Sequence, residues 1–341
     1  MTKDEIWMQR ALDLAKLGEG HVAPNPLVGC VIVQHDVVIG EGYHAQYGGP
    51  HAEVNAFQSL KQSAKGATVY VTLEPCSHFG KTPPCADLLI REQVQRVVIC
   101  NVDPNPLVAG KGIQRLLQAG IAVDVAILEK QGAEINQTFF HYHTKGRPWI
   151  TLKFAASADG FIAGEAGEPV QFSNEISKQL VHKLRTQHQA ILIGVNTAET
   201  DNPKLDARFW PGNNPIRIVL DPNNRMRHDR ILLQDELALL ICTKDFTHVA
   251  GNKQWIALGD DLLAGLMKYC QKEGIQSILV EGGTKTLEAF YAAGLADTIL
   301  QIQSGVSLKK GIKSPFQALS WELLEQVGAD NRWLRAKENL S

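Results

Sequence analysis

The chain has 341 residues, 44% hydrophobic and 21% charged, which is typical of a globular protein with room for about two domains. Its formal net charge is −2, so it lacks the basic surplus of most nucleic-acid-binding proteins. No apolar run approaches the ~20 residues that cross a bilayer, and we expect neither a membrane span nor a signal peptide. Six scattered cysteines indicate reduced thiols and a cytoplasmic protein.

Helices alternate with strands in the first part of the sequence. Apolar spacing predicts a helix over residues 4–18, and two β-branched runs joined by a short polar turn predict a hairpin over 28–44. We then expect helices at 52–63, 86–92 and 111–119, and strands at 67–72, 96–100 and near Val123. This order is typical of a three-layer α/β domain.

The pattern is interrupted by polar residues, Gly146 and Pro148 before a new strand begins at Trp149. We therefore place a domain boundary there, with domains 1–146 and 147–341. The second domain is also predicted to be α/β. We expect strands at 149–156, 190–194, 216–220, 237–242, 277–280 and 298–303, and helices at 174–186, 260–272 and 284–293.

Two segments of the first domain contain the residue types of a zinc site. PHAEVNAF (50–57) places His51 and Glu53 where a helix begins, and LEPCSHFGKTPPC (73–85) places Cys76 and Cys85 around a loop. Catalytic zinc sites use three imidazole or thiolate ligands and leave a position open for water, whose pKa falls to about 7. His51, Cys76 and Cys85 are such a set, and Glu53 can carry a proton without binding the metal. The pattern resembles the His-x-Glu and Pro-Cys signature of zinc-dependent deaminases.

The spacing of the two cysteines departs from the shortest form of that signature. Eight residues, rather than two, separate Cys76 from Cys85. The alternative interpretation is a capped helix with two buried thiols, because free cysteine commonly behaves as a small core hydrophobe.

Four segments together resemble the bifunctional deaminase/reductase family of riboflavin biosynthesis: APNPLVGCVIV (23–33), HAEVNA (51–56), EPCSHFGKTPPC (74–85) and DPNPLVAGKGI (103–113). In that family the long loop between the cysteines is the normal form. The resemblance implies a cytidine-deaminase-like fold and a phosphoribosylamino-pyrimidine substrate, whose 2-amino group is hydrolysed to a carbonyl. It also implies substrate contacts at Asn25, His44, His78 and Lys81, with Asp103 and Asn105 near the ribose phosphate.

The second domain has no G-x-G-x-x-G after a strand and no Walker sequence, so a Rossmann dinucleotide site is not supported. In ILVEGGTKTLEAF (278–290), glycines precede a predicted helix, whose free N–H groups attract phosphate. An ordinary strand, turn and helix explain this segment equally well. Joined to TLKFAASADGFIAG (151–164), HKLRTQHQAILIGVNTAETDNPKLDAR (182–208) and IRIVLD (216–221), it resembles the reductase half of the same family.

This second resemblance implies a dihydrofolate-reductase-like fold, NADPH reduction of the ribosyl group to ribityl, and a homodimer or homotetramer. Lys153, Asp201 and Glu281 would lie around the reacting sugar, with Lys153 and Asp201 catalytic. The chemistry needs a positioned acid, while the cofactor supplies the hydride. Arg185, Leu205 and Arg208 would face the substrate and its phosphate. The cofactor would contact Ala155, Gln171, Thr197, Asp201, Gly283, Thr284, Lys285, Thr286 and Leu287.

One segment departs from the family pattern. In GEPVQFSNE (167–175), Gln171 stands where an aromatic residue is common, and Pro169 where a substrate-facing serine is common. An alternative is therefore a deaminase whose second domain binds cofactor or assists assembly but has lost reduction. A further alternative is a nucleic-acid base deaminase with a recognition domain. That function needs a basic channel and stacking aromatics, whereas aromatics are 7% of the chain.

Overall fold

The computed structural model describes residues 1–77, 83–105, 108–168, 170–328 and 331–337. Three residues singled out from the sequence, His78, Lys81 and Pro169, lie outside these ranges. The chain divides into two compact units, Met1–Gly146 and Arg147–Ser341. Among the described residues, no helix is long and apolar enough to span a membrane.

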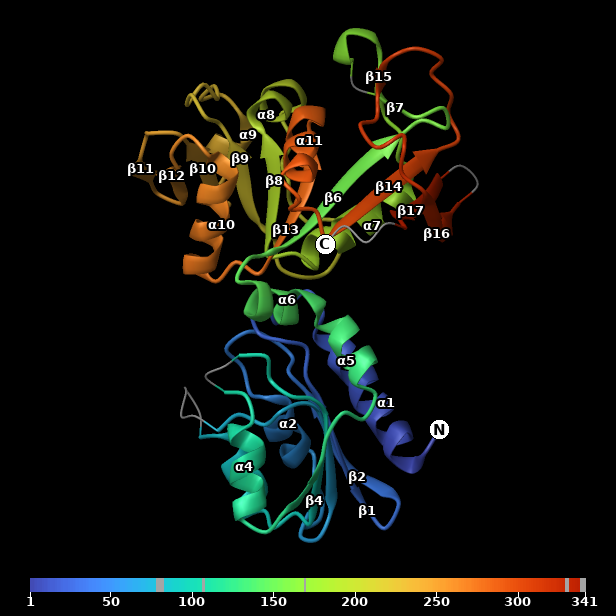
Figure 1. Cartoon of the computed structure of the whole chain (residues 1–341), viewed down its shortest axis with the longest axis vertical. Coiled ribbons are helices and arrows are strands. Elements are labelled where there is room, and N and C mark those ends of the chain that lie inside the picture. Colours follow the sequence, from blue (N-terminus) through green and yellow to red (C-terminus); the bar gives the residue numbers. More distant parts are fainter. Residues whose placement is uncertain (78–82, 106–107, 169, 329–330, 338–341) are drawn as a thin grey trace. The chain divides into compact units, whose positions relative to one another are not determined.

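The first unit is built on a five-stranded sheet in the order β2-β1-β3-β4-β5 (Figure 1). The predicted hairpin is confirmed. It consists of β1 (Gly29–Gln34) and β2 (Val37–Tyr43), joined by His35 and Asp36, whose φ angles of 53° and 61° suit a tight hairpin turn. The remaining strands are parallel to one another: β3 (Thr68–Leu73), β4 (Arg96–Asn101) and β5 (Ala122–Asp124).

Helices cover both faces of this sheet, so the predicted three-layer arrangement is confirmed (Figure 1). On one face Ala56, Leu89 and Leu116 join the apolar side of the sheet. On the other face Met8 and Leu12 join a second core. The first face carries α2 (Ala52–Gln58), α3 (Cys85–Arg91) and α4 (Lys111–Gln118), and the second carries α1 (Lys3–Ala15) and α5 (Glu129–Ile135), which α6 (Gln137–Lys145) follows.

Two features of this unit differ from the sequence prediction. Helix α2 ends at Gln58, five residues before the predicted end at Ser63. The Ser59 hydroxyl donates to the Ala56 carbonyl at 2.7 Å and accepts the Glu41 N–H at 2.9 Å, so side-chain hydrogen bonds replace the next helical turn. Helices α5 and α6 were not predicted, because their segment lacks a strong apolar period.

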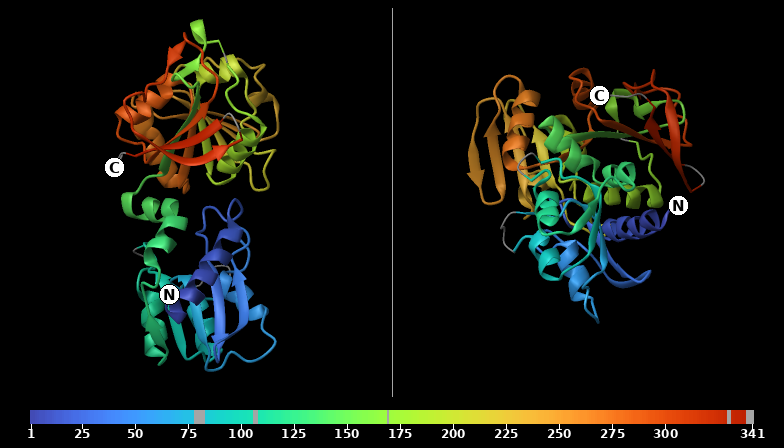
Figure 2. Two further views of the ribbon diagram at one scale, coloured as in Figure 1. Left: turned by 90° about the vertical axis from the view of Figure 1, so that its right-hand side faces the viewer. Right: turned by 60° about the horizontal axis from the view of Figure 1, so that its bottom comes forward.

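The second unit contains a ten-stranded sheet in the order β11-β12-β10-β9-β8-β13-β6-β14-β17-β16. Its central strands are parallel: β12 (Lys253–Ala257), β10 (Leu239–Thr243), β9 (Ile216–Leu220), β8 (Ala190–Gly194), β13 (Ser277–Gly282), β6 (Trp149–Ala156) and β14 (Thr298–Ser304). Antiparallel strands complete both edges: β11 (His248–Ala250), β17 (Asn331–Ala336) and β16 (Trp321–Val327). The right-hand view of Figure 2 shows these edges, with β16 and β17 in red.

Helices also cover both faces of this sheet (Figure 1). Leu266, Leu287 and Phe290 join the largest core on one face, and Ala198 and Leu232 join a core on the other. The first face carries α10 (Leu262–Glu273) and α11 (Thr284–Ala292), and the second carries α7 (Glu175–Thr186), α8 (Val195–Asp201) and α9 (Ile231–Gln234). A separate two-stranded sheet pairs β7 (Phe161–Ala163) with β15 (Ile312–Lys313).

Candidate active sites

Three ligand atoms converge in the first unit. His51 is the residue before α2, Cys76 follows β3, and Cys85 begins α3. The His51 Nδ1 lies 3.7 Å from the Cys76 sulfur and 3.3 Å from the Cys85 sulfur, and all three ligand atoms lie within 4.8 Å of one another. Tetrahedral zinc with ordinary bond lengths separates nitrogen and sulfur ligands by about 3.6 Å. The three residues therefore fit a zinc ion, and the alternative of two separate buried thiols does not describe them.

Cys76 and Cys85 shift each other's pKa. A hydrogen bond from the Cys85 thiol lowers the pKa of Cys76, burial opposes this shift, and His51 adds to it. The same hydrogen bond, together with burial, raises the pKa of Cys85. The backbone N–H of Cys85 also donates to the Cys76 sulfur at 3.3 Å. One thiolate is thus favoured before any metal binds, and metal binding would displace the remaining proton.

Glu53 lies beside this cluster, in the first turn of α2, and is 3% exposed. Burial raises the pKa of Glu53 to about 7, and the neighbouring Cys76 charge adds to the rise. A carboxyl group with such a pKa can both hold and release a proton near neutral pH.

Two of the predicted substrate contacts, Asn25 and His44, touch each other. The His44 Nδ1 lies 2.9 Å from the Pro50 carbonyl, and its Nε2 lies 3.0 Å from the Asn25 amide nitrogen. Because a carbonyl only accepts, Nδ1 carries the proton and Nε2 accepts from Asn25. Burial lowers the pKa of His44, which favours this neutral form. The ring of His44 packs edge-on against that of His51, so the pair lies next to the metal ligands.

The sequence analysis missed Glu74, a residue 4% exposed at the end of β3. Its carboxylate accepts the backbone N–H groups of Asp103 at 3.3 Å, Gly110 at 2.9 Å, Gly112 at 2.9 Å and Ile113 at 3.3 Å. A side chain at Gly112 would place its Cβ 2.0 Å from the Pro75 carbonyl, so this close approach needs glycine. The Asp103 carboxylate in turn accepts the Asn105 N–H at 2.8 Å. Glu74 therefore ties Asp103 and the start of α4 to the residues that follow β3, where Cys76 lies.

In the second unit, Lys153 of β6, Glu281 of β13 and Arg185 of α7 form a charged cluster. Arg185 donates to both carboxylate oxygens of Glu281, at 3.1 and 2.7 Å, and their side chains are 13% and 8% exposed. Burial favours the neutral acid, but the charges of Arg185 and Lys153 prevail and lower the pKa of Glu281 to about 2. Burial also lowers the pKa of Lys153, while the Glu281 charge opposes this shift. Glu281 is therefore an anion at neutral pH.

The segment 204–208 approaches this cluster. Arg185 donates its third hydrogen bond to the Asp206 carbonyl at 2.8 Å, and the Asp206 carboxylate pairs with Arg208. Leu205 is buried and has a φ of 55°, a region that residues with side chains rarely adopt. Arg208 is exposed and its guanidinium lies 4.7 Å from the centre of the Phe209 ring.

His182 was also missed from the sequence, although it stands one helical turn before Arg185 on α7. It is 5% exposed and packs edge-on against Phe209, with ring centres 4.7 Å apart. Its Nδ1 has no hydrogen-bond partner among the described residues. Burial and the charges of Arg185 and Arg208 lower the pKa of His182 to about 4, so the ring is neutral at physiological pH.

The predicted cofactor turn lies between β13 and α11. The Thr197 hydroxyl accepts the Gly283 N–H at 2.9 Å, and Gly283 has a φ of 20°. At Gly194, a Cβ would lie 2.4 Å from the Thr286 hydroxyl, which brings β8 close to the same helix start. The N–H groups of Thr286 and Leu287 already donate to the Gly283 carbonyl, and the Leu287 side chain is 2% exposed in the core. Thr284 and Lys285 occupy the helix start itself.

Three predicted residues remain, Ala155, Gln171 and Asp201. Asp201 ends α8 with an exposed side chain, and the charges that shift the pKa of Lys153 come from Glu281 and Arg185. Ala155 is partly buried in β6. Gln171 is exposed, while the neighbouring Phe172 is 6% exposed.

These sites and folds define a zinc-binding deaminase domain joined to a reductase domain. Residues 1–101 match the model of the cytidine and deoxycytidylate deaminase zinc-binding region, and residues 148–305 match that of the RibD C-terminal domain. The riboflavin biosynthesis protein RibD of Aquifex aeolicus is 41% identical over 304 residues, which are 87% of this chain and 85% of that protein. RibD of Escherichia coli is 40% identical over 322 residues, with 87% and 86% covered.

Solved structures agree with these sequence relationships. Acinetobacter baumannii RibD superposes with a TM-score of 0.89 at 34% identity, covering 98% of both chains. A diaminohydroxyphosphoribosylaminopyrimidine deaminase/5-amino-6-(5-phosphoribosylamino)uracil reductase from Thermotoga maritima gives the same TM-score at 33% identity and covers 98% of both chains. The chain belongs to the RibD family of bifunctional deaminase/reductase proteins of riboflavin biosynthesis, as its motifs predicted. Its N-terminal domain is cytidine-deaminase-like and its C-terminal domain is dihydrofolate-reductase-like.

Proposed function

We propose that the chain catalyses two successive steps on one small molecule. The first unit hydrolyses 2,5-diamino-6-(5-phosphoribosylamino)pyrimidin-4(3H)-one to 5-amino-6-(5-phosphoribosylamino)uracil and ammonia. The second unit reduces the ribosyl group of that product to ribityl with NADPH. The convergence of His51, Cys76 and Cys85 beside the nearly buried Glu53 is the observation that carries the proposal. The name of the Thermotoga maritima protein, whose structure this chain resembles over 98% of its length, supports both reactions.

In the deamination, His51, Cys76 and Cys85 would hold zinc, which supplies a Lewis acid that activates water when bound. Glu53 takes the proton that water loses and returns it to the departing amine, so that a carbonyl replaces the amino group and ammonia leaves. Its position in the first turn of α2, beside the metal ligands, suits both transfers. The Asn25 side-chain NH₂ group donates to His44. The side-chain oxygen of Asn25 can then accept a hydrogen bond from the edge of the pyrimidine.

In the reduction, C1′ of the opened sugar gains a hydride and the released oxygen gains a proton. The cofactor supplies the hydride. Glu281 cannot supply the proton, because its pKa of about 2 keeps it ionised. Lys153 is the neighbouring acid, and burial lowers its pKa toward the range in which an ammonium group donates readily. Arg208, with an exposed guanidinium, would bind the substrate phosphate, and Arg185 would orient Glu281.

NADPH is assigned to the edge of the sheet where β8 and β13 end. The Gly283 turn and the start of α11 offer backbone approach for phosphate. Thr197 fixes the turn, and the Leu287 side chain, buried in the core, holds the helix start that would contact the cofactor. Ala155, Gln171, Asp201, Thr284, Lys285 and Thr286 complete the proposed cofactor contacts. Fluorescence titration with NADPH and NADH tests this assignment.

The proposal extends to location and assembly. All six cysteines are free, as expected in a cytoplasmic protein. We also propose a homodimer or homotetramer formed through the second unit, with no nucleic-acid or membrane partner. Leu323 and Leu324 on the edge strand β16 are 56% and 44% exposed, which supports such an interface. Light scattering after size exclusion measures the oligomeric state.

A coupled assay tests the function as a whole. The purified protein is analysed for zinc and supplied with the phosphoribosyl diaminopyrimidine, while ammonia release and NADPH consumption are followed together. We expect zinc in equimolar amount and equal yields of ammonia and NADP⁺. Ammonia release without NADPH consumption would favour the alternative of a deaminase that has lost reduction. Full activity in a metal-free preparation would overturn the deaminase mechanism.

A further inference from the structure

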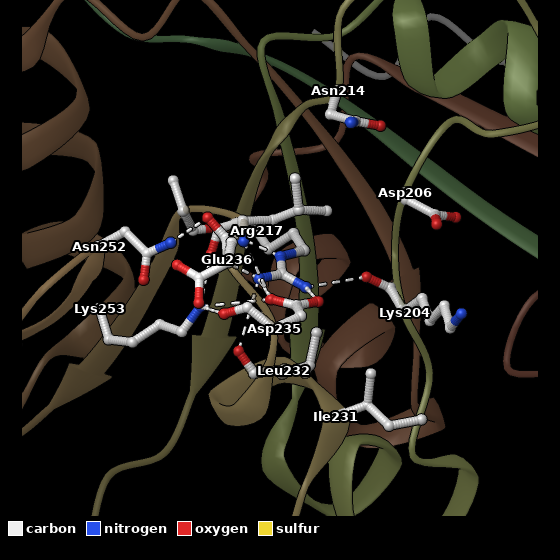
Figure 3. Close-up of polar contacts among 12 residues, drawn as sticks. Lys204, Asp206, Asn214, Arg217, Ile231, Leu232, Asp235, Glu236, Asn252 and Lys253 are labelled. Atoms are coloured by element: carbon white, nitrogen blue, oxygen red, sulfur yellow. Dashed lines mark hydrogen bonds and ion pairs between the residues drawn. The ribbon is translucent and has the colours of Figure 1, made fainter.

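Arg217 is a charged residue inside a central strand of the second sheet. It is 0% exposed and stands in β9 between the apolar strands β8 and β10, opposite Ile191 and Leu239. Its guanidinium donates to both carboxylate oxygens of Asp235, at 2.6 and 2.7 Å (Figure 3). It also donates to the carbonyls of Leu237 at 2.7 Å and Ala238 at 3.2 Å. A buried guanidinium needs such complete pairing, because its desolvation is costly.

Two further contacts reach beyond residues 235–238, and one of them is from Nη2 to the Leu232 carbonyl at 3.5 Å. The other is from Nη1 to the Lys204 carbonyl at 3.1 Å, a contact drawn in Figure 3. Lys253 belongs to the same network, since its ammonium group donates to the Asp235 and Leu237 carbonyls, both at 2.6 Å. Its hydrogen bonds go to the 235–237 loop, and Arg217 makes the link to Lys204.

A second anchor holds the same segment. The Asn214 side-chain oxygen accepts the Ala207 N–H at 2.8 Å. Together with the Arg185 bond to the Asp206 carbonyl, three side chains fix the backbone between residues 204 and 208. Leu205 has a φ of 55° within this stretch. Such a conformation persists only where the surrounding structure over-determines it.

We propose that Arg217 and Asn214 are positioning residues for the reductase substrate. By fixing the backbone of 204–208 they set the places of Leu205 and Arg208, the residues assigned to the substrate and its phosphate. The inference rests on the proposed function, because it assumes that this segment faces the substrate. Loss of either anchor lets the segment shift, and a displacement of the order of 1 Å costs roughly tenfold to a hundredfold in productive binding.

The test compares four single substitutions in the full-length protein. Asn214 is exposed, and Asn214→Ala removes the side-chain oxygen that accepts the Ala207 N–H. Asn214→Asp keeps an oxygen in the same place. Arg217→Lys keeps the charge beside Asp235 but cannot reach all the carbonyls. Lys253→Met is the matched control, because it perturbs the Asp235 network without touching Lys204. Steady-state reduction of the phosphoribosylaminouracil gives kcat and separate KM values for substrate and NADPH.

We expect Asn214→Ala and Arg217→Lys to raise the substrate KM roughly tenfold or more, with the NADPH KM and kcat nearly unchanged. Asn214→Asp should behave as wild type, and Lys253→Met should lower the melting temperature without changing the substrate KM. An unchanged KM in Asn214→Ala would overturn the proposal even if Arg217→Lys failed to fold. A rise in KM for Lys253→Met equal to that for Arg217→Lys would also overturn it, because the effect would then be one of general stability.

The Arg208→Ala variant distinguishes a failure of the proposed function from a failure of the positioning proposal alone. If it leaves the substrate KM unchanged, the assigned role of the 204–208 segment is wrong, and the positioning proposal falls with it. If it raises KM while the Asn214 and Arg217 substitutions do not, the proposed function stands and the positioning proposal alone fails.

Discussion

Glu53 and Glu281, two carboxylates with little solvent exposure, lie in opposite electrostatic surroundings, one in each unit. Glu53 is 3% exposed, and burial beside the negative Cys76 raises its pKa to about 7. The Glu281 side chain is 8% exposed, but two hydrogen bonds from Arg185 and the charge of Lys153 outweigh burial and lower its pKa to about 2. Similar burial thus gives pKa values that differ by several units, because only one of the two carboxylates has an arginine partner.

The different surroundings suit the two glutamates to different chemical roles. A carboxyl group that titrates near neutral pH can transfer protons, so Glu53 fits the acid and base of a hydrolysis. A carboxylate that stays ionised can only accept hydrogen bonds and orient other groups, so a reduction at Glu281 must take its proton from elsewhere. The proposed source is the neighbouring Lys153, whose pKa burial lowers. Each of the following experiments tests one side of this contrast.

Replacing Glu53 by Gln should have the largest effect. The amide cannot carry a proton, so deamination should fall roughly 10²–10⁴-fold, while zinc content and reduction of the uracil intermediate stay unchanged. Ammonia release, elemental analysis and NADPH oxidation measure the three quantities on one preparation. Normal deamination by this variant would show that another residue moves the proton.

Replacing Lys153 by Ala should lower kcat for reduction roughly a hundredfold or more and leave deamination intact, because the proposed proton donor is lost. Lys178→Ala is the control, since Lys178 pairs with the exposed Glu175 on the surface of α7. NADPH oxidation with the uracil intermediate gives the rate. Equal activity of the two variants would remove Lys153 from the mechanism.

Replacing Glu281 by Gln should lower the free energy of unfolding, because it removes the ion pair with Arg185. Since the pKa of Glu281 is about 2 in the folded state and ordinarily 4.5, the ionised carboxylate stabilises the fold above pH 4.5, and this contribution is lost as the pH falls toward 2. At pH 7 the variant should be less stable by on the order of 2–3 kcal/mol, and the difference should shrink below pH 4.5. A pH-independent difference would contradict the assigned pKa.

Denaturation followed by tryptophan fluorescence suits this measurement. Five of the six tryptophans, Trp149, Trp210, Trp255, Trp321 and Trp333, belong to the second unit, so the signal mainly reports its unfolding. The exposed Glu288→Gln is the matched control and should show no difference at any pH.

Gln171→Trp should have the smallest effect. If this position faces the cofactor, an aromatic ring there should tighten NADPH binding by about 1 kcal/mol, or roughly fivefold in Kd. Fluorescence titration of the wild type and variant gives both constants, and Gln171→Leu separates ring packing from added apolar area. Unchanged Kd values in both variants would place residue 171 away from the cofactor.

Features that produce a local pattern of residues could be predicted from the sequence. His51 and Glu53 are two residues apart at a helix start, and the helices and central strands follow apolar periods, so the fold class and the metal ligands could be predicted from residues alone. The Arg185 pair with Glu281 joins residues 96 positions apart, and no local pattern marks it. Glu74 and Arg217 bind backbone N–H and carbonyl groups, which nearly all residue types carry, so their partners have no sequence signature.

The division into two compact units at Gly146 has a consequence for mutant alleles of the gene. Each proposed set of reacting groups comes from one side of that division. A substitution of a reacting group in one half should therefore leave the reaction of the other half intact. Two defective alleles, broken on opposite sides, together still encode both activities, and a cell carrying both would regain the route that neither allele supports alone.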